Sequence, residues 1–312
     1  MMFRKLTLLA LTVLFTQTVN AQLYPVFSQY YFNELVLNPA YAGAHVQLSA
    51  TATYRHQWIN FPGAPKTLSF AAHSSFVRGK LGLGVMLNQD KIGSYANTDF
   101  TISYAYKIKM PRSTFSFGLQ AMGYFVGADF SKLNLKDLDD ASFSVINQFK
   151  PNFGAGIYYH RKDFFVGFSV PFLINSTFQS GSQVLTDLKQ RRNYFLRSGL
   201  IKNLDAKGNL KINPSILVRQ QEGQPLSVDL NMAMIFYDVL SGGVSYRSGD
   251  AIIGFISLKL AEQLHFNYSY DFTSSSLRPF SSGTHEFMIN YRYKISRVHK
   301  NLPCPTYWNY HE

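Results

Sequence analysis

Residue types that catalyse reactions or hold metal ions are present, but their spacing suits neither role. The eight histidines stand at positions 45, 56, 73, 160, 265, 285, 299 and 311, without the HxH or HxxxH spacing of a metal site. A serine hydrolase needs a Ser–His pair with an orienting third group, and His73-Ser74 and Thr284-His285 are merely adjacent. Adjacent residues on a strand point to opposite faces. We therefore predict no enzyme activity, no catalytic residue and no metal ion.

Two glycine-rich fragments and one acidic cluster also resemble ligand sites. Gly82–Gly84 and Gly154–Gly156 lack the Lys-Ser/Thr pair and following helix of a phosphate loop, so we interpret them as places where a strand packs closely or bends. Asp137, Asp139 and Asp140 could bind Ca²⁺, but they lack the glycine turn and distal Glu of an EF-hand. A solvated acidic loop is favoured, and no cofactor is predicted.

The composition indicates strands rather than spanning helices. Charged residues make up 15% of the 312 residues, against roughly 25% in ordinary soluble domains. Aromatic residues make up 16%, and the mean hydropathy is −0.08. No apolar run of about 18 residues follows the N-terminal region, which excludes spanning helices. One cysteine excludes an intrachain disulfide framework and any multi-cysteine metal site.

The first 21 residues have the pattern of a cleavable signal peptide. Arg4 and Lys5 precede a run of about ten apolar residues, which is too short to span a membrane, and small residues lead to Ala21. The alternative is a buried core helix. Export then leaves a chain from Gln22 with 28 basic and 18 acidic residues.

Strict alternation of apolar and polar residues recurs along the rest of the chain. It is clearest at 46–58, 100–109, 264–272 and 285–295. A tilted strand needs about nine to eleven residues to cross a bilayer. The alternating segments lie near 46–59, 66–77, 80–90, 95–109, 113–127, 150–161, 163–172, 192–204, 207–219, 226–237, 241–248, 250–260, 262–273 and 283–296.

We therefore predict an all-β fold, a transmembrane antiparallel outer-membrane β-barrel of about 14 strands over residues 46–296. Short turns such as Arg78-Gly79, 205–208 and 248–250 alternate with longer connections near 129–149, 173–191 and 274–283. A lipid-exposed sheet must close, because an open edge leaves unpaired amides in hydrocarbon. The alternative, a soluble β-sandwich, would have a Val-, Ile- and Leu-rich core face rather than one rich in Tyr and Phe.

The two ends of the mature chain do not alternate. Residues 22–45 are partly apolar and contain Asn38-Pro39 and Gly43, which predict a turn. We expect this segment to fold into the lumen as a plug, with a disordered leader as the alternative. Residues 297–312 form a C-terminal tail that includes Cys304.

Charged residues recur on the polar faces of distant segments. If the aromatic faces meet lipid, both signs of charge face the lumen, where water or an opposite charge must stabilise them. We predict a lumen ion network that joins plug and wall; a substrate path is the alternative. The residues are Arg55, Lys107, Arg219, Asp229, Asp271, Glu286 and Arg292, of which Arg55, Asp229, Asp271, Glu286 and Arg292 form the predicted network.

Short motifs run in order through nearly the whole mature chain. The N-terminal motif residues are Gln29, Tyr30, Asn38, Pro39, Ala40, Tyr41 and Gly43. Further pieces are 55–58, 63–65, 82–84, 92–93, 103–106, 151–154, 165–169, 245–247, 268–271 and 283–286. Together these motifs resemble the PorP/SprF family of type IX secretion system membrane proteins of Bacteroidota, although Thr284 replaces a usual serine.

The resemblance implies a non-enzymatic outer-membrane barrel of the type IX secretion and gliding apparatus. Some members of the family work with the periplasmic machinery, and others pair with a large secreted surface protein that they help to export or hold outside. The family supplies no catalytic residue. The basic excess favours anionic lipopolysaccharide or an acidic partner, and nucleic acid is implausible for an exported barrel.

A channel is the alternative function. The Asn-Pro-Ala run at 38–40 also resembles the hatch segment of FadL-type channels. On that interpretation the barrel is a FadL-like or porin-like channel for small, hydrophobic solutes. A channel needs a continuous lumen or a lateral opening, whereas a scaffold needs a docking surface on a rim.

Overall fold

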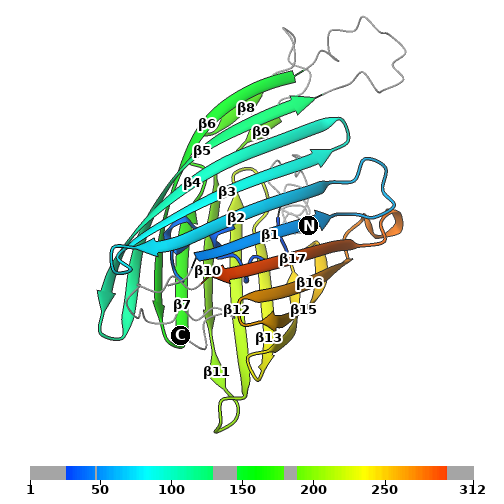
Figure 1. The fold of residues 1–312 in the computed structure, drawn as a ribbon. Helices are drawn as coiled ribbons and strands as arrows, with labels where there is room; N and C mark the ends of the chain where they lie inside the picture. The colour runs from blue at the N-terminus through cyan, green and yellow to red at the C-terminus, as the bar shows by residue number, and fades with distance from the viewer. Residues whose placement is uncertain (1–25, 46–47, 129–145, 179–187, 294–312) are drawn as a thin grey trace, which may run out of the picture.

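Alternating apolar and polar residues form long antiparallel strands in the computed structural model, which describes residues 26–45, 48–128, 146–178 and 188–293 (Figure 1). All fourteen segments that alternate in the sequence are strands, so the predicted barrel of about fourteen strands is confirmed. The fourteen are β1 (Leu48–His56), β2 (Lys66–Phe76), β3 (Leu81–Ile92), β4 (Tyr95–Met110), β5 (Ser113–Ala128), β6 (Ile146–Arg161), β7 (Phe164–Val170), β10 (Asn193–Leu200), β12 (Leu210–Gln221), β13 (Ser227–Phe236), β14 (Leu240–Arg247), β15 (Ala251–Ala261), β16 (Leu264–Thr273) and β17 (Thr284–Tyr293).

The ring of strands closes on itself. The first and last strands pair from Leu48 opposite Tyr293 to His56 opposite His285. On the far side β10 pairs with β12, and the two-residue β11 (Lys202–Asn203) extends the pairing along β12. Each of the fourteen described strands therefore has a neighbour on both sides, as a sheet in hydrocarbon requires.

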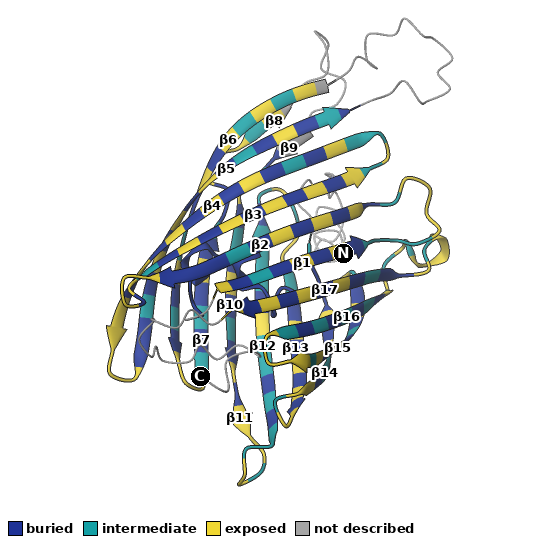
Figure 2. Cartoon of the chain, viewed as in Figure 1, coloured by how far each residue is buried: buried dark blue, intermediate teal, exposed yellow. Residues whose placement is uncertain are grey.

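Side chains along most of the strands alternate between a buried inner face and an exposed outer face (Figure 2). In β4, Phe100, Ile102 and Tyr104 are exposed, whereas Thr101 and Ser103 are buried. A soluble sandwich would bury its apolar face, so this inversion excludes the sandwich alternative and is typical of a barrel in lipid.

The two rims of the barrel differ. Turns β2–β3, β4–β5, β6–β7, β10–β12, β13–β14 and β15–β16 lie on one side, here called the short-turn rim. The connections β1–β2, β5–β6, β7–β10 and β16–β17 lie on the other, the long-loop rim, together with three shorter ones, β3–β4 (93–94), β12–β13 (222–226) and β14–β15 (248–250). The sequence placed residues 146–149 in a loop, but β6 already begins at Ile146. Within the β7–β10 connection a small hairpin of β8 (Ser176–Phe178) and β9 (Leu188–Gln190) was not foreseen.

Helical structure among the described residues is limited to single turns: η1 (Glu34–Val36), η2 (Pro39–Tyr41) and η4 (Arg278–Phe280). None of the helices there has the length and apolarity to cross a membrane. The predicted signal peptide at 1–21, the acidic loop at 137–140 and the tail at 297–312 lie outside the described residues and stay predictions.

Candidate functional site: the N-terminal segment inside the barrel

Residues 26–45, here called the N-terminal segment, lie inside the ring of strands. Every residue from Phe27 to His45 is buried, and Figure 1 shows part of the segment in dark blue, enclosed by the strands. The segment contacts inward side chains from both halves of the ring. It is the main apolar filling of the barrel interior, because most of the buried apolar cluster belongs to it.

Local sequence explains the path of this segment. Pro39 keeps Asn38 extended, with φ −141° and ψ 115°, and begins η2. The Asn38 Oδ1 accepts a hydrogen bond of 2.9 Å from the backbone N–H of Ala40. Gly43 has φ +63°, a conformation in which most residues are strained, and it turns the chain after η2. The turn predicted at Asn38–Gly43 is present.

A buried cluster of three charges holds the beginning of the N-terminal segment. The two guanidinium Nη atoms of Arg55 lie 2.8 Å from Asp271 Oδ2 and 2.8 Å from Glu286 Oε2. Glu286 also accepts hydrogen bonds from the backbone N–H groups of Ser28 (2.8 Å) and Gln29 (2.9 Å). Hydrogen bonds to charged groups stabilise by about 1.5–3 kcal/mol each. Strands β1, β16 and β17 are thus fastened to the segment at one point.

A second charged cluster lies on β12–β14. Asp229 is fully buried and lies 3.1 Å from Arg247 and 3.5 Å from Arg219. Arg247 also donates to the backbone carbonyl of Phe27 at 3.4 Å. The segment is therefore bonded to this half of the ring as well.

Glu34 forms the third charged contact between the N-terminal segment and the barrel wall. Its carboxylate lies 3.2 Å from the guanidinium of Arg197 on β10, and both side chains are buried. Burial raises the pKa of Glu34, and the charge of Arg197 opposes that effect. Arg197 also lies over the rings of Tyr30 (4.9 Å) and Phe165 (5.2 Å), which places a cation against two aromatic faces.

The end of the N-terminal segment is held by contacts with two histidines, His45 and His73. The backbone N–H of Gly43 donates to His73 Nδ1 at 3.1 Å, and Tyr41 Oη lies 3.2 Å from His45 Nε2. The rings of His45 and His73 stack with their centroids 5.1 Å apart. These histidines make structural contacts, and no described group of three His, Cys, Asp or Glu side chains could hold a metal ion.

A row of small residues on the inner wall seats η2. Its members are directly opposite one another across β2 to β7, so they form one row perpendicular to the strands. The small-residue row consists of Ser75, Gly82, Ala105, Gly118, Gly156 and Ser169.

The small-residue row lets the backbone of the N-terminal segment lie close against the wall. A Cβ at Gly82 would overlap the carbonyl of Ala42, and one at Gly118 would overlap the backbone of Ala40. At Gly156 a Cβ would collide with the side chain of Asn38. The interpretation of Gly82–Gly84 and Gly154–Gly156 as places of close packing is confirmed.

The first residues of the segment border a cavity of about 680 Å³ near the long-loop rim. Phe27, Tyr30 and Trp58 contribute aromatic walls, and Arg219 and Asp250 contribute charges of both signs. Its size is within the range of small-molecule sites, about 300–1,000 Å³.

Comparison with known protein families shows to which family this chain belongs. The family described as type IX secretion system membrane protein PorP/SprF matches residues 19–291. The chain belongs to the PorP/SprF family. The resemblance found in its motifs is thereby confirmed, and a search of the curated proteins finds no match.

Solved structures of outer-membrane barrels have a similar fold. The TodX deltaS2S3 mutant, a monoaromatic hydrocarbon channel, is similar with a TM-score of 0.50 and 9% identity, over 84% of this chain and 94% of that chain. The CymD monoaromatic hydrocarbon channel has a TM-score of 0.49 and 12% identity, over 88% and 95%. A Pseudomonas aeruginosa FadL homologue has 0.45 and 11%, over 87% and 95%. At such identities the TodX likeness supports the fold alone.

In this PorP/SprF chain the seven N-terminal motif residues lie in the buried N-terminal segment, and the predicted charged residues are divided between clusters. Arg55, Asp271 and Glu286 meet at one point, whereas Asp229 lies in the second cluster. The guanidinium of Arg292 lies 3.2 Å from His45 and 3.2 Å from Asn290. Lys107 is buried on the inner face of β4.

Sequence reasoning did not find Glu34, Arg197 or Arg247 as contact residues. Alternation could have placed Arg197 and Arg247 on inner faces, since each follows an outward apolar residue, Leu196 and Tyr246 respectively. Glu34 carries no such signal, because the N-terminal segment does not alternate.

Proposed function

We propose that this PorP/SprF barrel is a closed, non-enzymatic docking scaffold of the type IX secretion system. It supports export or surface anchoring of a secreted protein by protein–protein contact at its rims. The single observation that carries the proposal is the N-terminal segment, which is buried and bonded to inner-wall residues on both halves of the ring. Family membership supplies the secretion system.

A barrel filled in this way has little room for a passing polypeptide. The three charged contacts and the small-residue row each oppose removal of the segment, and buried ion pairs are costly to break. The surfaces left for partners are the two rims and the lipid-facing wall. In outer-membrane barrels the short turns face the periplasm, so the short-turn rim would meet periplasmic machinery and the long-loop rim a secreted protein and lipopolysaccharide. Residues 1–21 would be the cleaved signal peptide.

A channel is the second candidate, and the cavity near the long-loop rim supports it. Its aromatic walls suit a small apolar solute, and TodX, which is similar in fold, is named as a monoaromatic hydrocarbon channel. Transport by this route would require the N-terminal segment to move or the wall to open.

A deletion strain separates the two functions. We expect loss of export or surface retention of at least one secreted protein, with uptake of aromatic hydrocarbons unchanged. The affinity-tagged barrel, crosslinked in the outer membrane, should co-purify with a type IX component or that secreted protein. Normal surface proteins together with lost solute uptake would refute the scaffold.

A further inference from the structure

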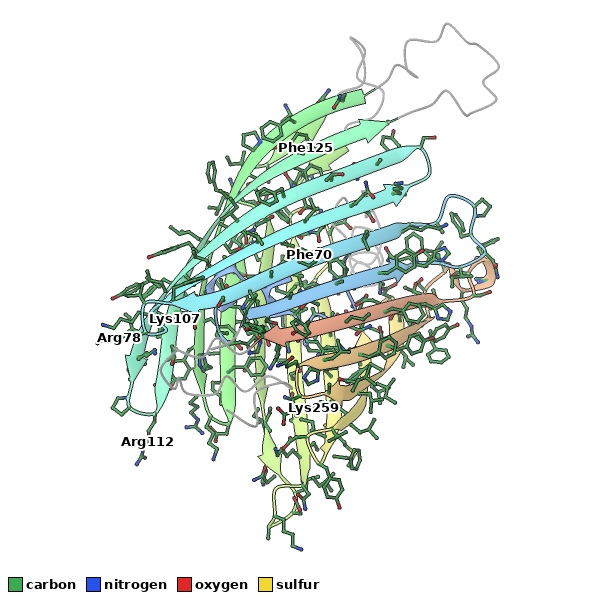
Figure 3. The ribbon with its side chains drawn as sticks, in the orientation of Figure 1. Phe70, Arg78, Lys107, Arg112, Phe125 and Lys259 are labelled. Carbon is green, nitrogen blue, oxygen red and sulfur yellow. The ribbon has the colours of Figure 1, made fainter. Side chains whose placement is uncertain are left out.

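Four consecutive turns of the short-turn rim carry a strong excess of positive charge. They are the turns β2–β3, β4–β5, β6–β7 and β10–β12, with the strand residues that border them. We call this set the basic arc, and Figure 3 shows Arg78 and Arg112 at this end of the barrel. Its basic residues are Arg78, Lys80, Lys109, Arg112, Arg161, Lys162, Lys202 and Lys207, all exposed, and its acidic residues are Asp163 and Asp205.

Both carboxylates of the basic arc are engaged within their own turns. Asp163 lies 2.6 Å from Arg161. Asp205 accepts hydrogen bonds from the backbone N–H groups of Leu210 (2.9 Å) and Asn209 (3.1 Å). Six positive charges therefore remain in excess over the four turns.

The rest of the same rim is balanced. Its two other turns and their borders carry Asp238 and Glu262 against Lys259, and the buried Lys211 at the start of β12 neutralises Asp238, with its Nζ 2.6 Å away. The excess charge of this rim is thus confined to one side of the barrel.

The long-loop rim has a smaller excess of basic over acidic residues when the whole sequence of its connections is counted. Its exposed or half-buried charges in the described residues are seven basic against two acidic. The sequence of its two longest connections adds five acidic and three basic residues, which reduces that excess.

A hydrogen bond links two neighbouring turns of the basic arc. Lys109 from the neighbouring turn donates to the carbonyl of Arg78 at 2.6 Å, so the two turns are linked. The cationic side chains are presented from a fixed rim rather than from long loops.

We infer that the basic arc docks the acidic face of a periplasmic protein. Lipid headgroups surround a barrel evenly and would favour charge around the whole rim, whereas a protein docks on one side. The arc runs from β2 to β12, and seven strand spacings of about 4.8 Å make it roughly 34 Å long, enough for a protein interface. The inference rests on the proposed function and adds the surface and the chemistry of the partner.

A charge-reversal variant tests the inference on the full chain. The arc variant combines Arg78→Glu, Arg112→Glu and Lys162→Glu, one from each of three turns. The control combines Lys66→Glu, Lys91→Glu and Arg278→Glu, which are exposed on the long-loop rim and change the net charge equally. In gel electrophoresis, both variants should show the heat-modifiable migration of a folded barrel.

The first measurement uses fluorescent poly-L-glutamate and barrels in phosphatidylcholine nanodiscs. We expect salt-sensitive binding to wild type and control, and at least about tenfold weaker binding to the arc variant. Equal binding by the two variants would overturn the inference. So would an arc variant that binds poly-L-glutamate normally but loses co-purified phosphatidylglycerol, because the arc would then serve lipid headgroups.

The second measurement is made in cells and separates this inference from the proposed function. The arc variant should lose the periplasmic partner that crosslinks to wild type, while the control keeps it. If the arc variant keeps that partner, the basic arc is not the docking surface and the scaffold still stands. If the deletion strain secretes normally and wild type captures no secretion component, the proposed function itself fails.

Discussion

Replacing Arg55 by methionine is expected to release the beginning of the N-terminal segment. Methionine keeps most of the apolar stem and removes the cation that lies 2.8 Å from both Asp271 and Glu286. It also removes the hydrogen bond of 2.8 Å from Arg55 to Ser28 Oγ. The two carboxylates, 4% and 0% exposed, then lose the one cation that contacts both of them.

The size of the effect follows from the burial of those carboxylates. Removing one partner of a buried ion pair costs about 3–5 kcal/mol, because the remaining charge is left uncompensated. Each 1.4 kcal/mol is a factor of ten in an equilibrium, so the open population of the segment should rise by roughly two to three and a half orders of magnitude.

Labelling of a buried cysteine measures this population. Val36→Cys in a Cys304→Ala background gives one thiol, at a buried position of the segment outside the charged cluster. With Arg55→Met we expect maleimide labelling at least about a hundredfold faster, since labelling follows the open population when reclosing is fast. Arg278→Met, an exposed residue, is the control. Labelling at the wild-type rate in the Arg55 variant would refute the reasoning.

Three more changes probe other contacts. Gly118→Ala inserts a Cβ into the backbone of the N-terminal segment and should destabilise the barrel by about 1–3 kcal/mol in thermal unfolding. Gly254→Ala, with nothing within 4 Å of the new Cβ, should leave the stability unchanged. Equal losses of stability would contradict the packing of η2 on the small-residue row. Arg197→Met should lower the free energy of unfolding by about 3–5 kcal/mol, because Glu34 loses its counter-charge. Adding Glu34→Gln should restore most of that loss. A double variant no more stable than Arg197→Met alone would contradict the ion pair. Backbone N–H donors lower the pKa of Asp205, so its stabilising effect is complete above the unfolded pKa of about 3.9 and is lost as pH falls through the lowered value. Wild type should therefore lose stability more steeply than Asp205→Asn below about pH 4, and parallel acid-unfolding curves would contradict this.

The strands were predictable because side-chain alternation is a local property. Segments such as 95–109 and 113–127 differ from β4 and β5 by only a residue at one end. The early start of β6 was missed because residues 146–149 were assigned to the long connection before it. The β8–β9 hairpin was missed because its strands have three residues each, too few for a pattern.

The seat of the N-terminal segment could not be predicted, because it depends on register. Gly82, Gly118 and Gly156 are far apart in the sequence and become neighbours only when β3 to β6 pair in one alignment. The charged contacts also depend on which strands pair. Arg55 and Glu286 are directly opposite each other because the first strand pairs with the last, which requires the ring to close.

Electrical recording across a planar bilayer tests the central claim that the N-terminal segment closes the barrel. Purified full-length protein should show no steady conductance at low voltage. Arg55→Met and Gly118→Val should each conduct, and Gly254→Ala should stay closed. A wild-type barrel that conducts steadily, at the level of those two variants, would contradict the account.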